Sequence, residues 1–284
     1  MRARMPRASS ASACSFPRRA LVFVLLVAGA PSAADAANEL CGQTLTSSVT
    51  FSANQNCGAN GITVMTRDVT IDLAGFTLQG TGGIGIFVLN DGVTILNGTI
   101  RGFEYGVAGS GHPTKMSNLV VRDNTVKGGE LSGTMIVDRC AFIGNGIGLQ
   151  LTLLSPDETG TVTNSAVVDN ASDGLNLLNA GGPVTIKGLT ASGNGGNGIT
   201  LRTSSDESVT TLSASTATAN AFRGIYMKGP RVTVQKNTVT GNAFGGIYAE
   251  EVAGARILAN TVDGNAQKGI ALTADSDGAL VSKN

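Results

Sequence analysis

The side chains best suited to chemistry follow a recurring Gly-Ile pair. Tyr226 and Tyr248 come directly after such pairs, and charged residues lie two positions further along equivalent segments. Strand alternation would turn these positions outward and place the two tyrosines on adjacent strands. Aromatic rings can pack on pyranose faces, and cations can bind the carboxylate of a uronate. The pattern therefore predicts a polysaccharide-binding site built from Tyr226, Tyr248, Arg202, Lys228 and Glu250.

An alternative interpretation of the same residues involves no ligand. Lys228 and Glu250 would form a cross-strand ion pair, and the two tyrosines would pack on each other. Such pairs commonly stabilise sheets, so the sequence leaves both interpretations open.

Acidic residues recur in the loops that follow these segments, namely Asp157, Glu158, Asp206 and Glu207. Carboxylates can supply the six or more oxygen ligands that Ca²⁺ requires. Acidic loop residues are also ordinary solvated surface. Calcium is therefore the one metal ion that the sequence suggests, and the expected function requires no cofactor.

His112 is the only histidine of the chain and lies in a Gly-His-Pro segment. A histidine that acts as a general base needs a reacting group and an orienting partner within hydrogen-bond reach. The sequence places no acidic residue beside His112. We therefore do not expect His112 to be catalytic.

The composition excludes several classes of protein. The 284 residues include 20 Lys and Arg against 20 Asp and Glu, and zero net charge argues against nucleic-acid binding. A hydrophobic fraction of 42% is enough for a folded core. The 39 glycines follow no three-residue period, which excludes collagen.

The N-terminus has the features of a secretory signal. Arginines without any acidic residue precede an apolar run from Ala20 to Ala30, and a small-residue stretch ends at Ala36. The run is shorter than the roughly 20 apolar residues of a membrane span. We expect a signal peptide over residues 1–36 and no membrane anchor after cleavage. The domain over residues 37–284 is expected to be secreted or periplasmic.

Export would also permit a disulfide. Cys41 and Cys57 lie sixteen residues apart near the start of the exported domain. Closing a loop of that size would stabilise the fold by about 3 kcal/mol. Cys140 lies in an apolar strand pattern and is expected to be a buried core residue.

A repeat of the form Asn-x-x-x-Gly-Ile/Leu determines the architecture. Short β-rich runs with two-residue alternation lie between its copies. One unit cannot bury its apolar face alone, but stacked units share a continuous core. The glycines of the five clearest copies are 24, 26, 22 and 23 residues apart, and these copies begin at Asn170, Asn194, Asn220, Asn242 and Asn265.

These features predict an all-β solenoid, a parallel β-helix of about ten coils with 22–26 residues and three short strands per coil. The leucine-rich-repeat frame and the acidic residue of calcium-binding nonapeptide repeats are both missing. The asparagines are expected in turns or in a stacked ladder. The 16 residues between Asn124 and Cys140 predict one short or distorted coil.

The start of this solenoid resembles a known family. Cys41-Gly42, Cys57-Gly58 and the segment from Val69 to Gly80 are similar to the first coils of secreted bacterial right-handed β-helix proteins. These belong to the pectate-lyase-like superfamily, and the resemblance extends over about residues 38–284. It implies a single-stranded, right-handed β-helix. In that superfamily the same coil carries lyases, hydrolases, epimerases, adhesins and non-catalytic carbohydrate-binding proteins.

The catalytic motifs of the enzymatic relatives are missing from this sequence. Polygalacturonase-like enzymes have an Asp-Asp pair, Gly-His-Gly and Arg-x-Lys, whereas this chain has Gly111-His112-Pro113. The pectate-lyase-like Arg-x-Pro-x-x-Arg and the alginate-epimerase-like Asp-Pro-His-Asp are also absent. The sequence therefore leaves enzymatic activity undecided.

Three functions follow from these observations. The favoured one is an exported, non-catalytic β-helix that binds polysaccharide or presents a rigid surface at the cell envelope. The second is a polysaccharide lyase or related carbohydrate-active enzyme acting on uronates, with Arg202 or Lys228 as the base. The third is an adhesin or partner-binding scaffold that associates through an uncapped C-terminal coil, because solenoid ends need a cap.

Overall fold

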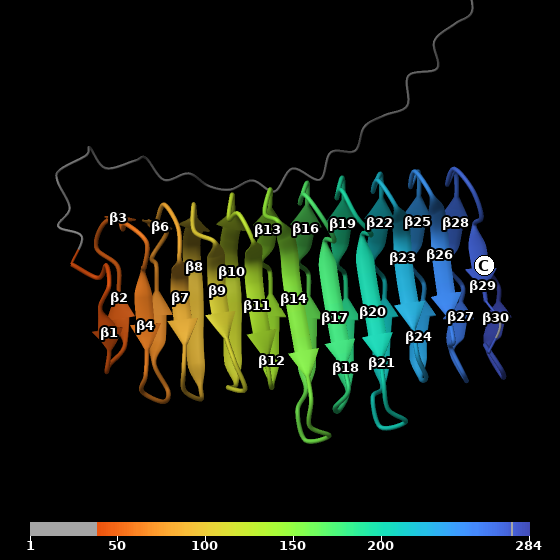
Figure 1. Ribbon diagram of the computed structural model, residues 1–284, viewed down its shortest axis with the longest axis horizontal. Helices are drawn as coiled ribbons and strands as arrows, with labels where there is room; N and C mark the ends of the chain where they lie inside the picture. Colours follow the sequence, from red (N-terminus) through yellow and green to blue (C-terminus); the bar gives the residue numbers. More distant parts are fainter. Residues whose placement is uncertain (1–38, 274) are drawn as a thin grey trace, which may run out of the picture. The chain divides into compact units, whose positions relative to one another are not determined.

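A stack of parallel coils makes up the chain, as a computed structural model that describes residues 39–273 and 275–284 shows (Figure 1). The predicted signal peptide lies outside these residues. Every regular element in the described ranges is a β-strand, and each strand pairs in parallel with its counterpart in the next coil. The predicted all-β parallel solenoid is confirmed. No membrane-spanning helix is found in this part of the chain.

Three sheets run along the stack. Sheet 1 has 11 strands, which agrees with about ten predicted coils. These strands are β1 (Thr44–Leu45), β4 (Ile62–Val64), β7 (Ile84–Val88), β9 (Tyr105–Gly109), β11 (Lys127–Ser132), β14 (Ile147–Leu153), β17 (Leu175–Asn179), β20 (Ile199–Thr203), β23 (Arg223–Lys228), β26 (Gly245–Glu250) and β29 (Ile270–Leu272).

Sheets 2 and 3 complete each coil, and two long strands, β8 (Val93–Arg101) and β10 (Thr114–Arg122), run through both. The other strands of sheet 2 are β2 (Val49–Thr50), β5 (Thr70–Asp72), β12 (Met135–Asp138), β15 (Gly160–Thr163), β18 (Val184–Lys187), β21 (Thr210–Ser213), β24 (Val232–Gln235), β27 (Arg256–Leu258) and β30 (Leu280–Ser282). Those of sheet 3 are β3 (Gln55–Asn56), β6 (Thr77–Gln79), β13 (Ala141–Ile143), β16 (Ala166–Val168), β19 (Thr190–Ser192), β22 (Thr216–Thr218), β25 (Thr238–Thr240) and β28 (Thr261–Asp263).

The inward side chains of the three sheets form one continuous core. It is rich in Ile, Leu and Val, with Phe103 and Phe142 fully buried. Each such side chain stabilises the fold by about 1.5–3 kcal/mol through burial. Cys140 is buried in this core as predicted, and burial raises the pKa of its thiol to about 12.

A ladder of buried asparagines lines the turn between sheets 3 and 1. From Asn124 onward, the side-chain oxygen of each next asparagine accepts the backbone and side-chain N–H groups of the asparagine one coil before it. For Asn194 and Asn220 these distances are 3.1 and 2.9 Å. The ladder confirms the stacking predicted for the repeat and contains the buried Asn124, Asn145, Asn170, Asn194, Asn220 and Asn242 and, at its end, the half-buried Asn265.

The glycine of the repeat is required by the same ladder. A Cβ added to Gly198 would lie 2.6 Å from Nδ2 of Asn220 and 2.8 Å from the carbonyl oxygen of Gly224. Real Cβ atoms do not approach other heavy atoms this closely. The Asn-x-x-x-Gly spacing therefore reflects a contact between neighbouring coils, in which the asparagine of one coil occupies the space that glycine leaves open.

The coil predicted to be short or distorted is short but regular. Val120 pairs with Ala141, and Asn124 stacks on Asn145, so this coil has 21 residues. Asn124 belongs to the buried ladder and does not begin a strand, which is why its spacing to Cys140 was misleading. Some coils also fall below the predicted range, since Gly129 pairs with Leu149 twenty residues later.

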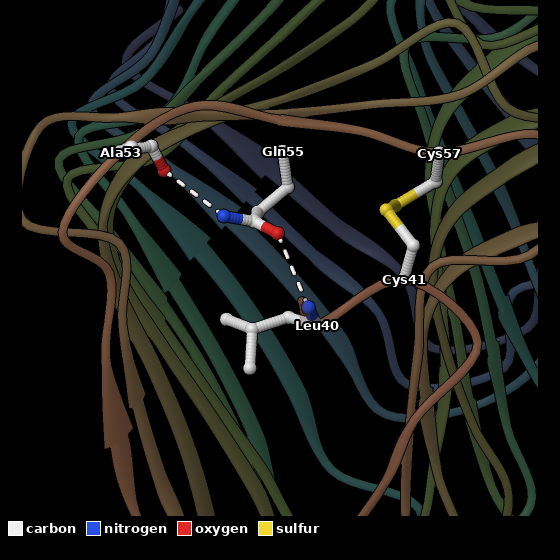
Figure 2. Close-up of a disulfide and its surroundings, with 5 residues drawn as sticks. All are labelled: Leu40, Cys41, Ala53, Gln55 and Cys57. Carbon is white, nitrogen blue, oxygen red and sulfur yellow. Dashed lines mark hydrogen bonds between the residues drawn. A yellow bond between two sulfur atoms is a disulfide. The ribbon is translucent and has the colours of Figure 1, made fainter. Parts of the chain in front are cut away.

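The predicted disulfide is present in the first coil and joins Cys41 to Cys57 (Figure 2). Gln55 lies beside it, and its side-chain oxygen accepts the N–H of Leu40 at 3.2 Å. Its amide nitrogen donates to the carbonyl of Ala53 at 3.4 Å. The disulfide and Gln55 together tie the segment that precedes β1 to the turn around β3.

Candidate functional site

The outward face of sheet 1 carries the side chains predicted to bind a ligand. The register pairs Tyr226 with Tyr248, Arg202 with Lys228, and Lys228 with Glu250 on neighbouring strands. Strands β20, β23 and β26 thus bring all five predicted residues into one cluster, which we call the tyrosine cluster. The alignment of repeats was sufficient to place them, because parallel pairing keeps equivalent positions in line.

The contacts in the tyrosine cluster are those of the interpretation without a ligand. Lys228 Nζ lies 2.7 Å from Glu250 Oε1 and 3.2 Å from Glu251 Oε1. The rings of Tyr226 and Tyr248 stack with centroids 6.1 Å apart. These groups stabilise one another, so any ligand must bind to surfaces that the pairing leaves open.

Hydrogen bonding shifts the titration of these groups. The bonds to Glu250 and Glu251 raise the pKa of Lys228 to about 12, and the bond to Lys228 lowers the pKa of Glu250. Desolvation, together with the bond that Tyr226 donates to Glu250, raises the pKa of Tyr226. Lys228 therefore remains protonated at neutral pH, which makes it a poor general base.

Arg223 is a member of this cluster that the sequence did not reveal. Its guanidinium carbon lies 4.2 and 5.1 Å from the ring centroids of Phe222 and Phe244, and 5.6 and 4.1 Å from those of Tyr226 and Tyr248. The two phenylalanines also pack together, with ring centroids 4.6 Å apart. Because the position next to Arg223 on β26 is Gly245, there is room for the guanidinium between the ring pairs.

A groove of about 420 Å³ lies on the same face, over strands β7 to β14. Ala108 on β9 is flanked in register by Phe87 on β7 and Glu130 on β11, so a small residue lies between two large ones. The small side chain of Ala108 between two larger side chains leaves a depression in the surface. Tyr105, Ser110, Ser132 and Leu154 also line the groove.

One feature of the sequence points to this groove. Phe87 follows Gly85-Ile86 and Ala108 follows Gly106-Val107, as the tyrosines follow their Gly-Ile pairs, but Glu130 belongs to a less regular copy of the repeat. The pairing of β9 with β11 was needed to see that these residues form a hollow.

His112 has an acidic partner, contrary to the prediction. Its Nδ1 lies 2.8 Å from Oδ1 of Asp91, and Arg67 contacts the other carboxylate oxygen at 3.5 Å. Asp91 is 21 residues earlier in the chain, one coil away, so local sequence could not reveal it. A carboxylate only accepts hydrogen bonds, so Nδ1 carries the proton and Nε2 remains free. The groove-lining residue Ser110 lies two positions before His112.

The acidic loop residues do not assemble into a metal site. Within the described ranges, no three His, Cys, Asp or Glu side chains form a group that could hold a metal ion. Glu158 instead accepts the backbone N–H groups of Leu154 and Ser155 at 2.6 and 3.2 Å. Asp157 and Glu158 follow β14 whereas Asp206 and Glu207 follow β20, and β17 lies between these strands. Calcium binding by these acids stays a prediction.

Comparison with known proteins identifies the fold. Residues 60–209 and 173–284 match the family described as a right-handed β-helix region. The chain belongs to this family. No curated protein sequence matches this β-helix protein.

Two solved structures share the architecture of this β-helix protein. The A-module of Azotobacter vinelandii mannuronan C-5 epimerase AlgE6 matches with a TM-score of 0.60 and 16% identity, over 84% of this chain and 76% of its own. The A-module of epimerase AlgE4 from the same organism matches with a TM-score of 0.53 and 14% identity, over 83% and 72%. At these identities the likeness concerns the fold, and it agrees with the predicted right-handed single-stranded β-helix.

Proposed function

We propose that this β-helix protein binds polysaccharide along the outward face of sheet 1, with the groove over β7 to β14 as the principal site. The observation that carries the proposal is the groove itself. Two aromatic residues, Phe87 and Tyr105, and two hydroxyl-bearing residues, Ser110 and Ser132, line it. A pyranose has an apolar face and a rim of hydroxyl groups, so it binds to aromatic rings that have a few polar groups beside them.

The tyrosine cluster would supply a second contact for long chains. It lies on the same face as the groove, five strand spacings from β9 to β23, or roughly 24 Å. The ring of Tyr248 is followed on β29 by the small residue Ala271, which leaves space beside the ring. The structural neighbours, named as mannuronan epimerases, support a carbohydrate-related function. In this proposal the chain is exported, as residues 1–36 predict, and needs no cofactor.

Binding should depend on the groove for all chain lengths and on the tyrosine cluster only for long chains. Phe87→Ala is expected to weaken the affinity for a binding oligosaccharide about tenfold, since it removes the main ring surface. Tyr248→Ala should weaken binding of a polymer but leave that of a short oligosaccharide unchanged. Isothermal titration calorimetry against a glycan panel measures both.

The matched control is Ile136→Ala, which removes an exposed apolar side chain from sheet 2. It should leave every affinity unchanged. If Phe87→Ala binds as the wild type does while remaining folded by circular dichroism, the groove is not the site.

A second candidate function is favoured by the pair of His112 and Asp91. An imidazole whose Nδ1 is held by a carboxylate can use Nε2 as a general base or acid. The ion-paired Lys228 is a weaker candidate for that role, and Arg202 donates instead to Asn176 at 3.1 Å. The alternative is thus a polysaccharide lyase or related carbohydrate-active enzyme that uses His112.

This alternative makes its own prediction. If the wild type releases unsaturated product or reducing ends from any glycan, His112→Ala should lower that rate at least tenfold, and about 100-fold if general base catalysis contributes fully. Asp91→Asn should lower it as well because it removes the charge that orients the imidazole. Product formation that survives both substitutions, or its absence from the wild type across the panel, would reject the catalytic role.

A further inference from the structure

The charges around the groove limit which polysaccharide it can hold. Glu130 is the one charged residue among those that line the groove in the described part of the chain. Lys127 contacts two of the groove-lining residues, with its Nζ 2.5 Å from Glu130 Oε1 and 5.8 Å from the centroid of the Tyr105 ring. Lys127 is therefore already bound on two sides.

Exposure decides which member of this pair meets a ligand. The side chain of Lys127 is 15% exposed, whereas that of Glu130 is 38% exposed. The side chain of Glu130 lines the groove, whereas the largely covered side chain of Lys127 does not. A ligand in the groove would meet negative charge, ring surfaces and hydroxyl groups, with no free cation.

We infer that the groove selects an uncharged pyranose polysaccharide and discriminates against uronate chains. This inference rests on the proposed polysaccharide-binding function and specifies its substrate class. Glu130 can accept hydrogen bonds from sugar hydroxyls, and Ser132, whose oxygen accepts the N–H of Gly111 at 2.8 Å, retains its own O–H to donate. A uronate carboxylate beside Glu130 would face a like charge, while the ammonium of Lys127 is already paired with Glu130, and unpaired like-charge contacts of this kind suppress binding.

The test compares hexamers of glucose, mannose and xylose with hexamers of galacturonate and mannuronate, using the purified full chain and calorimetry. At least one neutral hexamer should bind about tenfold more tightly than either uronate hexamer. Its affinity should change little with salt concentration, because no ion pair forms across the interface.

Glu130→Gln keeps the shape of the side chain and removes its charge. We expect this variant to raise uronate affinity about tenfold and to leave neutral affinity within threefold. Asp263→Asn is the control, since it removes the same charge from β28 of sheet 3, on a different face. That variant should leave the discrimination unchanged.

Three other outcomes are distinguishable. Equal or tighter binding of uronates by the wild type would overturn the neutral selectivity while keeping the proposed function. A discrimination that persists in Glu130→Gln would show that Glu130 does not cause it, which also overturns the inference. If no hexamer of either class binds, the proposed function itself fails and the inference fails with it.

Discussion

Asn194→Ala is expected to destabilise the protein by about 3–5 kcal/mol. Asn194 is completely buried. Its oxygen accepts the backbone N–H of Asn170 at 3.1 Å and the side-chain amide of Asn170 at 2.9 Å. Its amide donates to Asn220 and to the carbonyl of Val167. Alanine would leave these buried partners without hydrogen bonds and would open a cavity between coils, and both effects destabilise.

Denaturant unfolding followed by circular dichroism measures this loss. Asn54→Ala is the control, because Asn54 is exposed and its oxygen accepts one N–H, that of Thr77, at 2.8 Å. Water can replace that bond, so the control should lose no more than about 1 kcal/mol. Equal losses in the two variants would show that the ladder contributes no more than a surface turn.

Gly198→Ala is expected to lower the free energy of unfolding by a similar amount, for a different reason. The added methyl group would overlap the side-chain amide of Asn220 and the carbonyl of Gly224 on the next coil. Both groups are held by hydrogen bonds along the stack, so neither can move without disturbing its neighbours. Overpacking of this kind costs about 1–3 kcal/mol, and we expect the upper end with added loss from the ladder.

The control for this substitution is Gly82→Ala. A Cβ at Gly82 would have no neighbouring heavy atom within 4 Å, and the residue has no positive φ that favours glycine. The melting temperature of Gly82→Ala should match that of the wild type. If the melting temperature of Gly198→Ala equals that of Gly82→Ala, the close approach of neighbouring coils at Gly198 is not needed for stability.

Much of the fold could be predicted because a repeat carries its own tertiary information. In a parallel stack, residues one repeat apart become neighbours, so the alignment of Gly198, Gly224 and Gly246 already specifies which strands pair. The Tyr226–Tyr248 contact and the Lys228–Glu250 pair followed from that alignment alone. The disulfide between Cys41 and Cys57 could be predicted because Cys140 is the one other cysteine in residues 37–284 and lies in an apolar strand pattern.

Predictions failed where the repeat loses its motif. The first coils lack the Asn-x-x-x-Gly-Ile form, so Asn124 was assigned to the wrong position and the partner of His112 was missed. Asp91 lies 21 residues earlier, in the corresponding turn of the preceding coil. Without a motif, nothing in the local sequence shows which residue of the preceding coil lies beside a given side chain.

The sequence by itself determined the solenoid, its three strands per coil, the buried Cys140 and the row that contains the tyrosine cluster. The tertiary structure alone decided which of these side chains remain free. Lys228 forms ion pairs with Glu250 and Glu251, and the guanidinium of Arg223 packs against four aromatic rings. The hollow between Phe87 and Glu130 also depends on side-chain sizes across three strands. Alignment fixes which residues are neighbours, whereas packing between them fixes what surface is left for a ligand.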